Sequence, residues 1–470
     1  MHNQPMLGRL TALTTVLLLA LGVAPASGGP GEPATTTLTV SSPKRFADEA
    51  TRVRLTLVAE DGEPVAGQPV TLDRRRNGEW QQVAALVTDA DGEAVTDVVL
   101  ARDASDNVVR ATYDGDDVTW AGDRTGPEQL RMERREGIVT LGGPDSVVDD
   151  RQVTLTVRWR ARNGTPVPGR VSLYRRLGGG DWKRVARPRL GEDGTATIDS
   201  RPRQDSRWQA RARRLDWVTG DRSGVHKVDN LPPGNPVQLP AGAPRPRVNL
   251  PDQRYAVGAG AHAVVTRIPN AVWNQMTGRS WHRGCPVGRP SLRLLRINYW
   301  DYQGYRHRGE LVAHADAMPN MRGALTAMYQ QKLPIRSMYR VDRFGWSRRL
   351  QGADDYRSMA AGNTSAFNCR SVVGRPGVRS PHAYGRALDI NTWENPYHSS
   401  HGWTPNGWWP SRSHPRVAWR SRQHPVVRVM LNHGFRWTYG TQDSQHFDAP
   451  AGSGRVIMPR DARCATDVCH

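Results

Sequence analysis

Two segments of the chain, residues 35–125 and 137–228, repeat the same landmarks at offsets near a hundred residues. In each segment, apolar residues alternate with polar ones, and the runs are broken by turns that contain Gly, Pro or Asp-Gly. The matched positions are Val53, Leu55 and Leu57 with Val153, Leu155 and Val157, Pro64–Gly67 with Pro166–Gly169, and Asp91-Gly92 with Asp193-Gly194. Alternation with a period of two predicts antiparallel β-sandwiches. We therefore expect two all-β domains, here called the first repeat (35–125) and the second repeat (137–228).

Trp80 and Trp182 occupy equivalent positions in the two repeats. An aromatic residue that recurs at one place suits a shared core, so we expect both to pack between sheets rather than to form a carbohydrate platform. The repeats resemble bacterial immunoglobulin-like modules, which often accompany surface and wall enzymes. Neither repeat contains Cys, so the inter-sheet disulfide of antibody domains is absent. Spacing the C-terminal domain from its target and binding the cell wall both remain open as their role.

The first 26 residues have the pattern of a secretory signal peptide. Arg9 precedes an uncharged, mostly apolar run at residues 10–23, and Ala24-Pro25-Ala26 offers a small-residue cleavage site. An uncleaved anchor is the alternative, although the run is shorter than a membrane span usually is. No later segment is long and apolar enough to cross a bilayer. We expect a secreted protein, extracellular or associated with the cell wall.

All four cysteines lie in the C-terminal half of the chain: Cys285, Cys369, Cys464 and Cys469. An even number in an exported chain suggests two disulfides, and three pairings are possible. We favour Cys464 with Cys469, which are close in sequence, leaving Cys285 with Cys369. A four-thiolate zinc site is the alternative, but paired C-x-x-C units are missing and an oxidising compartment disfavours free thiolates.

The chain has a formal net charge of +20, which predicts attraction to polyanions such as anionic wall polymers, lipid head groups or nucleic acid. Arg recurs in every region of the chain, as it does in Arg-, Ala- and Gly-rich compositions generally. Composition alone therefore names no specific polyanion partner, and specific nucleic-acid binding is not expected.

Residues 229–253 are dense in Pro and predict a stiff, extended linker. The composition then changes, because ten of the sixteen Trp and all the Cys lie beyond residue 253. Helical spacing appears at residues 321–331 and 424–433, and strand-like runs at residues 291–299 and 387–390. We expect a compact α+β domain at residues 254–470.

The strongest chemical signal is the run Ser380-Pro-His382-Ala-Tyr-Gly-Arg-Ala-Leu-Asp389, followed by Asp443-Ser-Gln-His446-Phe. Catalytic zinc takes three protein ligands from His, Asp and Glu and leaves a fourth position for water. A turn followed by a strand would fold His382 and Asp389 toward one point, and His446 would complete the set. Zinc lowers the pKa of its water to about 7, and Asp443 is the candidate general base.

These motifs, S-x-H-x-x-G-x-A-x-D and D-x-x-H-F, are similar to the signature of the D-alanyl-D-alanine carboxypeptidase family of zinc peptidases, which includes the L-alanyl-D-glutamate endopeptidases of phage lysins. Further matching elements are Trp281–Val287, Leu333–Ile335, Asn363–Arg370 and Glu394–Tyr397. The resemblance covers roughly residues 260–450. It implies Zn²⁺ held by His382, Asp389 and His446, with Asp443 as the catalytic carboxylate.

The same resemblance places Arg340 beside the substrate carbonyl, where it would bind substrate and stabilise an oxyanion. Ser380 would either hydrogen-bond substrate or a ligand, or cap a turn. His398 and His401 form H-x-x-H, which suits either a metal site or a solvated loop. Trp403, Trp408 and Trp409 either flank a cleft or pack against the domain.

The sequence thus predicts a secreted zinc metallopeptidase that hydrolyses an amide bond in peptidoglycan stem peptides, as a D,D-carboxypeptidase or an L,D-endopeptidase. One alternative is a non-catalytic wall-binding protein that retains the peptidase fold. Another is an adhesin-like protein whose repeats carry the main function. The sequence does not specify which bond is cleaved, because loops such as residues 393–420 shape the ends of the cleft.

Overall fold

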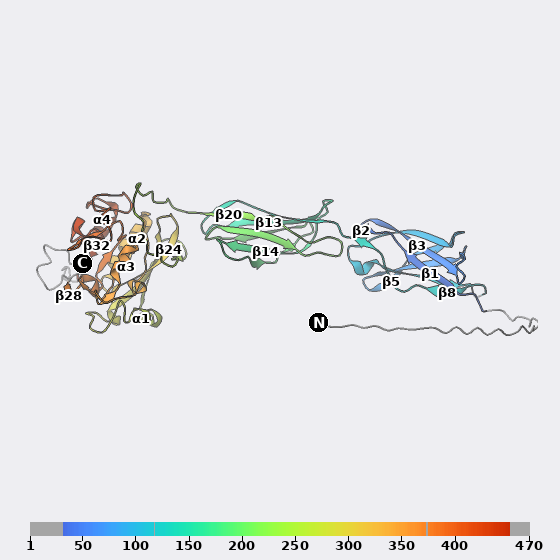
Figure 1. The fold of residues 1–470 in the computed structure, drawn as a ribbon, viewed down its shortest axis with the longest axis horizontal. Coiled ribbons are helices and arrows are strands. Elements are labelled where there is room, and N and C mark those ends of the chain that lie inside the picture. Colours follow the sequence, from blue (N-terminus) through green and yellow to red (C-terminus); the bar gives the residue numbers. More distant parts are fainter. Residues whose placement is uncertain (1–31, 117, 373–374, 452–470) are drawn as a thin grey trace, which may run out of the picture.

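The computed structural model describes residues 32–116, 118–372 and 375–451 (Figure 1). Figure 1 shows three bodies in chain order, two built from strands and a C-terminal one that mixes helices with strands. Strands dominate, and the described residues form four α-helices. The chain is therefore β-rich and multidomain, as predicted. The signal-peptide prediction and the Cys464–Cys469 pairing lie outside the described residues.

The first repeat consists of two antiparallel sheets that enclose one apolar core. The smaller sheet has the order β1 (Thr36–Ser41), β3 (Ala50–Ala59), β6 (Glu93–Val99). The larger sheet has the order β5 (Glu79–Val87), β4 (Pro69–Arg76), β7 (Val108–Gly115), β8 (Ala121–Arg124), and β9 (Glu128–Gln129) also pairs with β7. Inward residues such as Leu55, Leu72 and Val109 are fully buried between the sheets.

The second repeat has the same arrangement around its own core. Its smaller sheet has the order β11 (Gly137–Gly142), β13 (Val153–Ala161), β17 (Thr195–Ser200). Its larger sheet has the order β12 (Ser146–Val148), β20 (His226–Leu231), β18 (Ser206–Ala212), β14 (Gly169–Leu177), β15 (Lys183–Ala186), with β16 (Arg189–Leu190) on β14 and β19 (Asp221–Arg222) on β18. In the first repeat, β2 (Arg45–Phe46) pairs in parallel with β10 (Met132–Glu133) of the segment that joins the repeats, and η1 (Ala104–Asn107) precedes β7.

The Asp-Gly turn that marks both repeats requires glycine for the same reason in each. Gly92 and Gly194 have φ of 68° and 69°. A Cβ at either position would lie 2.5 Å from a backbone oxygen of the neighbouring strand, that of Leu57 in the first repeat and that of Trp159 in the second. Because only glycine tolerates both the conformation and the close approach, the repeated sequence encodes a repeated turn.

The prediction that Trp80 and Trp182 pack in the cores is wrong. Both are half-exposed on the outer face of the larger sheet, where the guanidinium of Arg110 lies 4.4 Å from the ring of Trp80 and that of Arg176 lies 5.3 Å from the ring of Trp182. The second core is filled instead by Trp159, Trp208 and Trp217. Equivalent sequence positions fix the face of a strand, but they do not tell which face is inside.

The C-terminal domain is built on an antiparallel sheet with the order β21 (Arg254–Tyr255), β24 (Arg306–His314), β23 (Leu292–Trp300), β22 (Val264–Arg267). Helix α2 (Met318–Gln330) packs on β23, and α4 (Pro425–Asn432) packs on α2. The predicted helices at 321–331 and 424–433 and the predicted strands at 291–299 and 387–390 are confirmed, with ends shifted by one to three residues.

Shorter elements complete this domain. They are α1 (Asn270–Met276), α3 (Asp355–Ala360), the 3₁₀ helices η2 (Arg289–Ser291), η3 (Val341–Phe344), η4 (Pro381–Tyr384) and η5 (Gly440–Gln442), and four two-stranded sheets: β25 (Trp346–Ser347) with β26 (Gly352–Ala353), β27 (Ser371–Val372) with β28 (Arg375–Arg379), β29 (Ala387–Asp389) with β32 (His446–Asp448), and β30 (Tyr397–Ser399) with β31 (Gly402–Thr404). A disulfide joins Cys285 to Cys369, the pairing favoured from the sequence.

The Pro-rich segment 234–253 lies along the surface of the C-terminal domain and is hydrogen-bonded to it at several points. Trp393 Nε1 donates to the carbonyl of Pro244 at 2.7 Å, and the Oε1 of Gln253 accepts from the backbone N–H of Met338 at 2.9 Å. Val248 and Leu250 pack against a buried cluster that includes Phe344. The segment is extended, as predicted, but it forms part of the surface of the domain.

Over the described residues, no helix combines the length and apolar character that a membrane crossing requires.

Candidate functional site

The small sheet β29–β32 brings together two segments that are far apart in the sequence. Its antiparallel register places Asp389 directly opposite His446 and Leu388 opposite Phe447. Because side chains alternate along a strand, Leu388 and Phe447 enter the apolar core on one face. Asp389 and His446 therefore face together toward the other side of the sheet.

The tight turn η4 delivers His382 to the same place. Ser380 caps this turn, because its Oγ accepts a hydrogen bond from the backbone N–H of His382 at 3.3 Å. Gly385 ends the turn with φ of 67°, and a Cβ there would lie 2.7 Å from the backbone nitrogen of His314. Of the two roles considered for Ser380, the structure shows the capping one. The need for glycine at position 385 comes from the turn itself.

Three ligand atoms converge at this point. Possible ligand atoms of His382, Asp389 and His446 all lie within 4.8 Å of one another, and all three residues are buried. His382 Nε2 lies 3.2 Å from His446 Nδ1, while the Asp389 carboxylate lies 3.1 Å from His382 Nε2 and 3.0 Å from His446 Nδ1. Ligands about 2.0–2.1 Å from a tetrahedral zinc ion would be about 3.3 Å apart. The three side chains could therefore hold a metal ion.

The remaining ring nitrogens are held in the way that metal-binding imidazoles require. His382 Nδ1 donates to the carbonyl of Ala366 at 2.6 Å, and His446 Nε2 donates to the carboxylate of Asp448 at 3.1 Å. Each hydrogen bond fixes the proton on the outer nitrogen and leaves the inner nitrogen with a lone pair. Two lone pairs and a carboxylate facing one another form a donor set that fits a cation.

The electrostatics of the site also favour a positive charge at its centre. Burial by itself would raise the pKa of Asp389, but the imidazoles of His382 and His446, when protonated, hold this pKa well below its usual value through their charge and hydrogen bonds. Burial disfavours the charged form of His446, yet Asp448 and Asp389 raise its pKa well above the usual range. The pocket therefore stabilises cationic charge where the inner nitrogens meet.

Asp443, the predicted general base, is fully buried next to these ligands. It precedes β32 by three residues, and its backbone forms an isolated bridge with Tyr397. Burial raises the pKa of Asp443 well above its usual value, and the carboxylates of Asp389 and Asp448 add to this against the opposing charge of His446. These effects place Asp443 within the electrostatic environment of two candidate ligands, Asp389 and His446.

Arg370 is a member of this environment that the sequence analysis did not single out. Its side chain is fully buried, it forms an ion pair with Asp355 at 2.7 Å, and its charge acts on both Asp443 and Tyr397. The signal was available, since Arg370 ends the matching element Asn363–Arg370 and directly follows the disulfide-bonded Cys369.

Arg340, predicted to bind the substrate carbonyl, has a guanidinium that is engaged by other side chains. It donates to Glu310, to Gln275 at 2.5 Å and to both carboxylate oxygens of Asp342 at 3.0 and 3.1 Å. The residue is 5% exposed. These contacts describe a buried ion-pair network, and the substrate-binding role of Arg340 stays a prediction.

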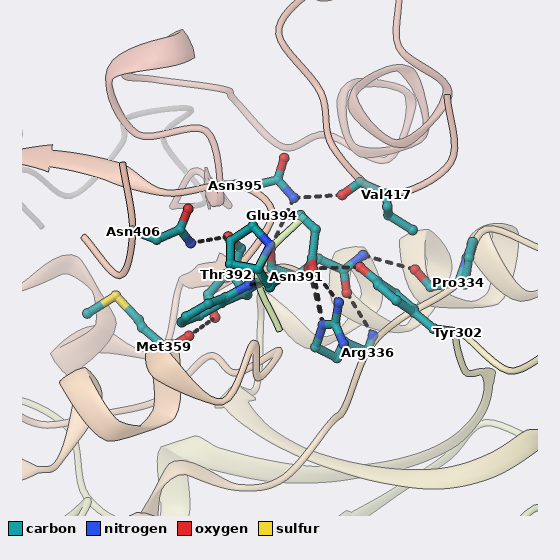
Figure 2. A network of polar contacts seen from close by, with 12 residues as sticks. Tyr302, Pro334, Arg336, Met359, Asn391, Thr392, Glu394, Asn395, Asn406 and Val417 are labelled. Carbon is teal, nitrogen blue, oxygen red and sulfur yellow. Dashed lines mark hydrogen bonds and ion pairs between the residues drawn. The ribbon is translucent and has the colours of Figure 1, made fainter. Parts of the chain in front are cut away.

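The loop that follows Asp389 is fixed by a dense polar network (Figure 2). Asn391 has φ of 49°, donates to the carbonyl of Pro334 at 2.9 Å and accepts from the backbone N–H of Arg336 at 2.9 Å. Glu394 is fully buried, pairs with Arg336 and accepts from the hydroxyl of Tyr302 at 2.9 Å. This network anchors the chain two residues beyond a candidate metal ligand.

Within the described part of the chain, one other group of three side chains is close enough to hold a metal: His282, Cys285 and Cys369. The disulfide between its two sulfurs removes both thiolates, which argues against the four-thiolate zinc site. The ring of His398, from the H-x-x-H pair, lies edge-on to the ring of Trp403 in the β30–β31 hairpin, with centroids 4.9 Å apart. Trp409 is fully buried, so it packs against the domain.

Comparison with known families agrees with this geometry. The sequence model of the family described as D-alanyl-D-alanine carboxypeptidase matches residues 373–449, which contain the three candidate ligands and Asp443. The match supports a peptidase-type domain at the C-terminal end of the chain, and a peptidoglycan peptide is the substrate that this family implies. No curated protein sequence matches the chain.

Several solved structures show weak likeness. A tetra-tandem repeat from the extending region of a large adhesion protein matches with 13% identity and a TM-score of 0.28, over 60% of this chain and 64% of that one. A marsupial T cell receptor matches with 10% identity and a TM-score of 0.22, over 59% and 93%. The native conformation of E. coli alpha-2-macroglobulin matches with 11% identity and a TM-score of 0.20, over 60% and 20%. At these TM-scores the likenesses support no conclusion about fold or function.

Proposed function

We propose that the C-terminal domain is a zinc-dependent peptidase that hydrolyses an amide bond in peptidoglycan stem peptides. The observation that carries the proposal is the convergence of His382 Nε2, His446 Nδ1 and the Asp389 carboxylate, with both outer ring nitrogens already hydrogen-bonded. This convergence lies inside the segment that matches a peptidase family. A signal peptide at residues 1–26 and immunoglobulin-like folds for both repeats belong to the same proposal.

In the proposed hydrolysis, the bound metal ion and the side chains around it have separate roles. A bound Zn²⁺ would act as a Lewis acid that polarises the scissile carbonyl and lowers the pKa of water. Asp443 accepts a proton from the attacking water and returns it to the leaving amine nitrogen. Asp448 and the carbonyl of Ala366 keep His446 and His382 in the ligand tautomer. Arg370 supplies positive charge near Asp443.

The test separates metal binding from turnover. His382→Ala should lose zinc and activity together, whereas Asp443→Asn should retain zinc and lose turnover on purified peptidoglycan by roughly 10²–10⁴-fold. His398→Ala, which removes an imidazole from the β30–β31 hairpin, is the matched control and should retain both. Zinc is measured by elemental analysis and products by the mass of released fragments, which also identifies the bond cleaved. Full turnover in Asp443→Asn would refute the assigned base. A zinc content near zero after supplementation would favour the non-catalytic wall-binding alternative.

The two arginines are distinguished by kinetics. Arg370→Lys should lower kcat by more than its loss of stability explains, because it retains a charge near Asp443 but loses the planar guanidinium that pairs with Asp355. Arg340→Lys should mainly lower the unfolding midpoint, because Arg340 is held by Glu310 and Asp342. A large loss of kcat in Arg340→Lys with unchanged stability would instead assign the carbonyl-binding role to Arg340.

A further inference from the structure

The two repeats share a strand arrangement but differ in the sign of their charge. Residues 35–125 hold 10 Lys and Arg against 17 Asp and Glu, a net charge of −7, whereas residues 137–228 hold 19 against 10, a net charge of +9. The positive charge of the chain is therefore not evenly spread, although Arg occurs in every region. A difference of this size between two copies of one unit points to different surroundings for each.

Six of the cations of the second repeat lie on the outer face of its larger sheet. Val171 and Leu173 of β14 enter the core, so Ser172, Tyr174 and Arg176 face outward. Residues directly opposite one another in neighbouring strands share a face. The register then adds cations from β15, β18, β19 and β20. We call the resulting set the basic face: Arg176, Arg184, Arg207, Arg211, Arg222 and Lys227.

Like charges stand directly opposite one another across this face. Arg176 pairs with Arg207, Arg207 with Lys227, and Arg211 with Arg222. Such pairs destabilise a sheet, so the fold itself gains nothing from them. Among the residues that the structure describes, no acidic side chain forms an ion pair with any of the six. Four of the six, Arg184, Arg207, Arg222 and Lys227, are exposed to solvent, and Arg176 and Arg211 are partly buried.

On the corresponding face of the first repeat, a cation is paired with an acidic residue. Asp73 of β4 stands opposite Arg110 of β7 and forms an ion pair with it at 2.9 Å. The equivalent pair in the second repeat is Tyr174 with Gln209, both uncharged. The first repeat therefore pairs a cation on this face with an acidic residue of the same sheet, whereas the second repeat has no charged pair at the equivalent position.

Two of the cations are also held in place. The guanidinium of Arg211 lies 4.3 Å from the ring of Tyr174 and donates to Gln209 Oε1 at 3.0 Å. The guanidinium of Arg176 lies 5.3 Å from the ring of Trp182. Stacking on an aromatic ring orients the planar guanidinium and leaves its outer N–H groups available for the oxygens of a phosphate.

We propose that the basic face of the second repeat binds a linear polyanion of the phosphodiester class, an anionic wall polymer. Neighbouring strands lie about 4.8 Å apart, so Arg176, Arg207 and Lys227 form a regular row of charge across β14, β18 and β20. A repeating anion can follow this row. The choice of a wall polymer among polyanions rests on the proposed function, because a peptidase of wall peptides works beside such polymers. The second repeat thereby holds the C-terminal domain at its substrate.

The test measures binding of the full-length protein to poly(glycerol phosphate), which has no amide bond, so its outcome is independent of whether the peptidase proposal holds. Replacing Arg207, Arg211 and Lys227 by Gln should weaken binding at least tenfold. It should also reduce the slope of log affinity against log salt by about 2, because each phosphate that a cation neutralises adds about 0.7 to this slope. Arg75→Gln, Arg76→Gln and Arg124→Gln together make the same change of charge on the first repeat, and should weaken binding less than twofold.

Three results would overturn the proposal. Equal weakening in both triple variants would show attraction by net charge alone. Failure of the unaltered protein to bind the polymer would remove the partner, and binding confined to duplex DNA or to phosphatidylglycerol vesicles would assign a different one. To exclude a folding defect, a variant with Arg207→Lys and Arg222→Lys should keep its affinity within about threefold, because it retains the charges and leaves the stacked Arg211 unchanged. A tenfold loss of affinity there would also contradict a role based on charge.

Discussion

The interior of the C-terminal domain differs from the interiors of the two repeats in its charge. Within the described residues of the repeats, Arg74 and Asp149 are the buried charged side chains. The C-terminal domain buries a much larger set: Asp301, Arg308, Arg340, Asp342, Asp355, Arg370, Arg386, Asp389, Glu394, Asp443 and Asp448, together with His382, His414 and His446. Burying a charged group costs free energy unless the group is paired, so we expect buried charges mainly where the chemistry of a site requires them. The repeats therefore have interiors that are almost free of charged side chains over their described residues, whereas the C-terminal domain places many charged side chains in its interior, including those of the candidate site.

Removal of zinc should have the largest effect, and it should affect the C-terminal domain but not the repeats. We expect chelation to abolish turnover and to lower the unfolding midpoint of the C-terminal domain, because a ligand that binds only the folded state stabilises it. Its three candidate ligands would be left facing one another without a cation. The transition of the repeats should not move. Calorimetry with and without chelator measures both transitions, and an unchanged midpoint of the C-terminal domain would contradict a metal centre there.

Removal of one partner of an ion pair should then distinguish a buried pair of the C-terminal domain from a surface pair of the first repeat. Glu394→Gln leaves Arg336 without its carboxylate partner in the buried network and should cost about 3–5 kcal/mol of folding free energy. Glu93→Gln breaks the Arg54–Glu93 pair, whose side chains are 49% and 27% exposed, and should cost about 0–1 kcal/mol. Chemical denaturation of both variants tests the difference, and equal costs would mean that the buried pair contributes no more to stability than the surface pair.

Truncation of an apolar side chain should lower stability without affecting chemistry when it is made in a repeat. Leu155→Ala empties a fully buried position in the second core and should cost about 2–5 kcal/mol. Turnover on a small soluble peptide should stay within about twofold, because the core of the second repeat contains no residue of the candidate site. A large loss of turnover at full folding would show that the repeats act on the site directly.

The smallest effect is expected on the surface of the second repeat. Arg207→Gln removes two like-charge pairs, with Arg176 and Lys227, and should raise the unfolding free energy by no more than about 0.5 kcal/mol. The equivalent measurement on Arg75→Gln should show no gain. A decrease of stability in Arg207→Gln would mean that the basic face supports the fold, which would weaken the case for a binding role.

The local features of the sequence were sufficient for much of the fold and for the candidate ligands. Apolar alternation in both repeats and helical spacing at residues 321–331 and 424–433 describe elements that the structure contains. His382 and Asp389 are close in the chain, and their turn and strand follow from local chemistry. The position of His446 depends instead on the register of β29 with β32, a pairing across 57 residues.

Other features depended on which groups meet in space. Trp80 and Trp182 lie outside their cores because the strand face that turns inward is set by packing against the second sheet. Arg370 and Arg340 are both single Arg residues in the sequence. In the structure the two residues differ in their neighbours, since Arg370 lies near Asp443 and Arg340 is enclosed by Glu310, Gln275 and Asp342.

By itself, the sequence determined the repeated β units, the Pro-rich segment, the α+β character of the last domain and the residue types of the candidate metal site, because each of these is encoded over short stretches by periodicity, turn residues and motif spacing. Only the tertiary structure decided that two ring nitrogens and a carboxylate share one point, that residues 234–253 are hydrogen-bonded to the C-terminal domain, and that the cations of the second repeat gather on one sheet face. Those outcomes depend on strand register and long-range packing, which no local pattern specifies.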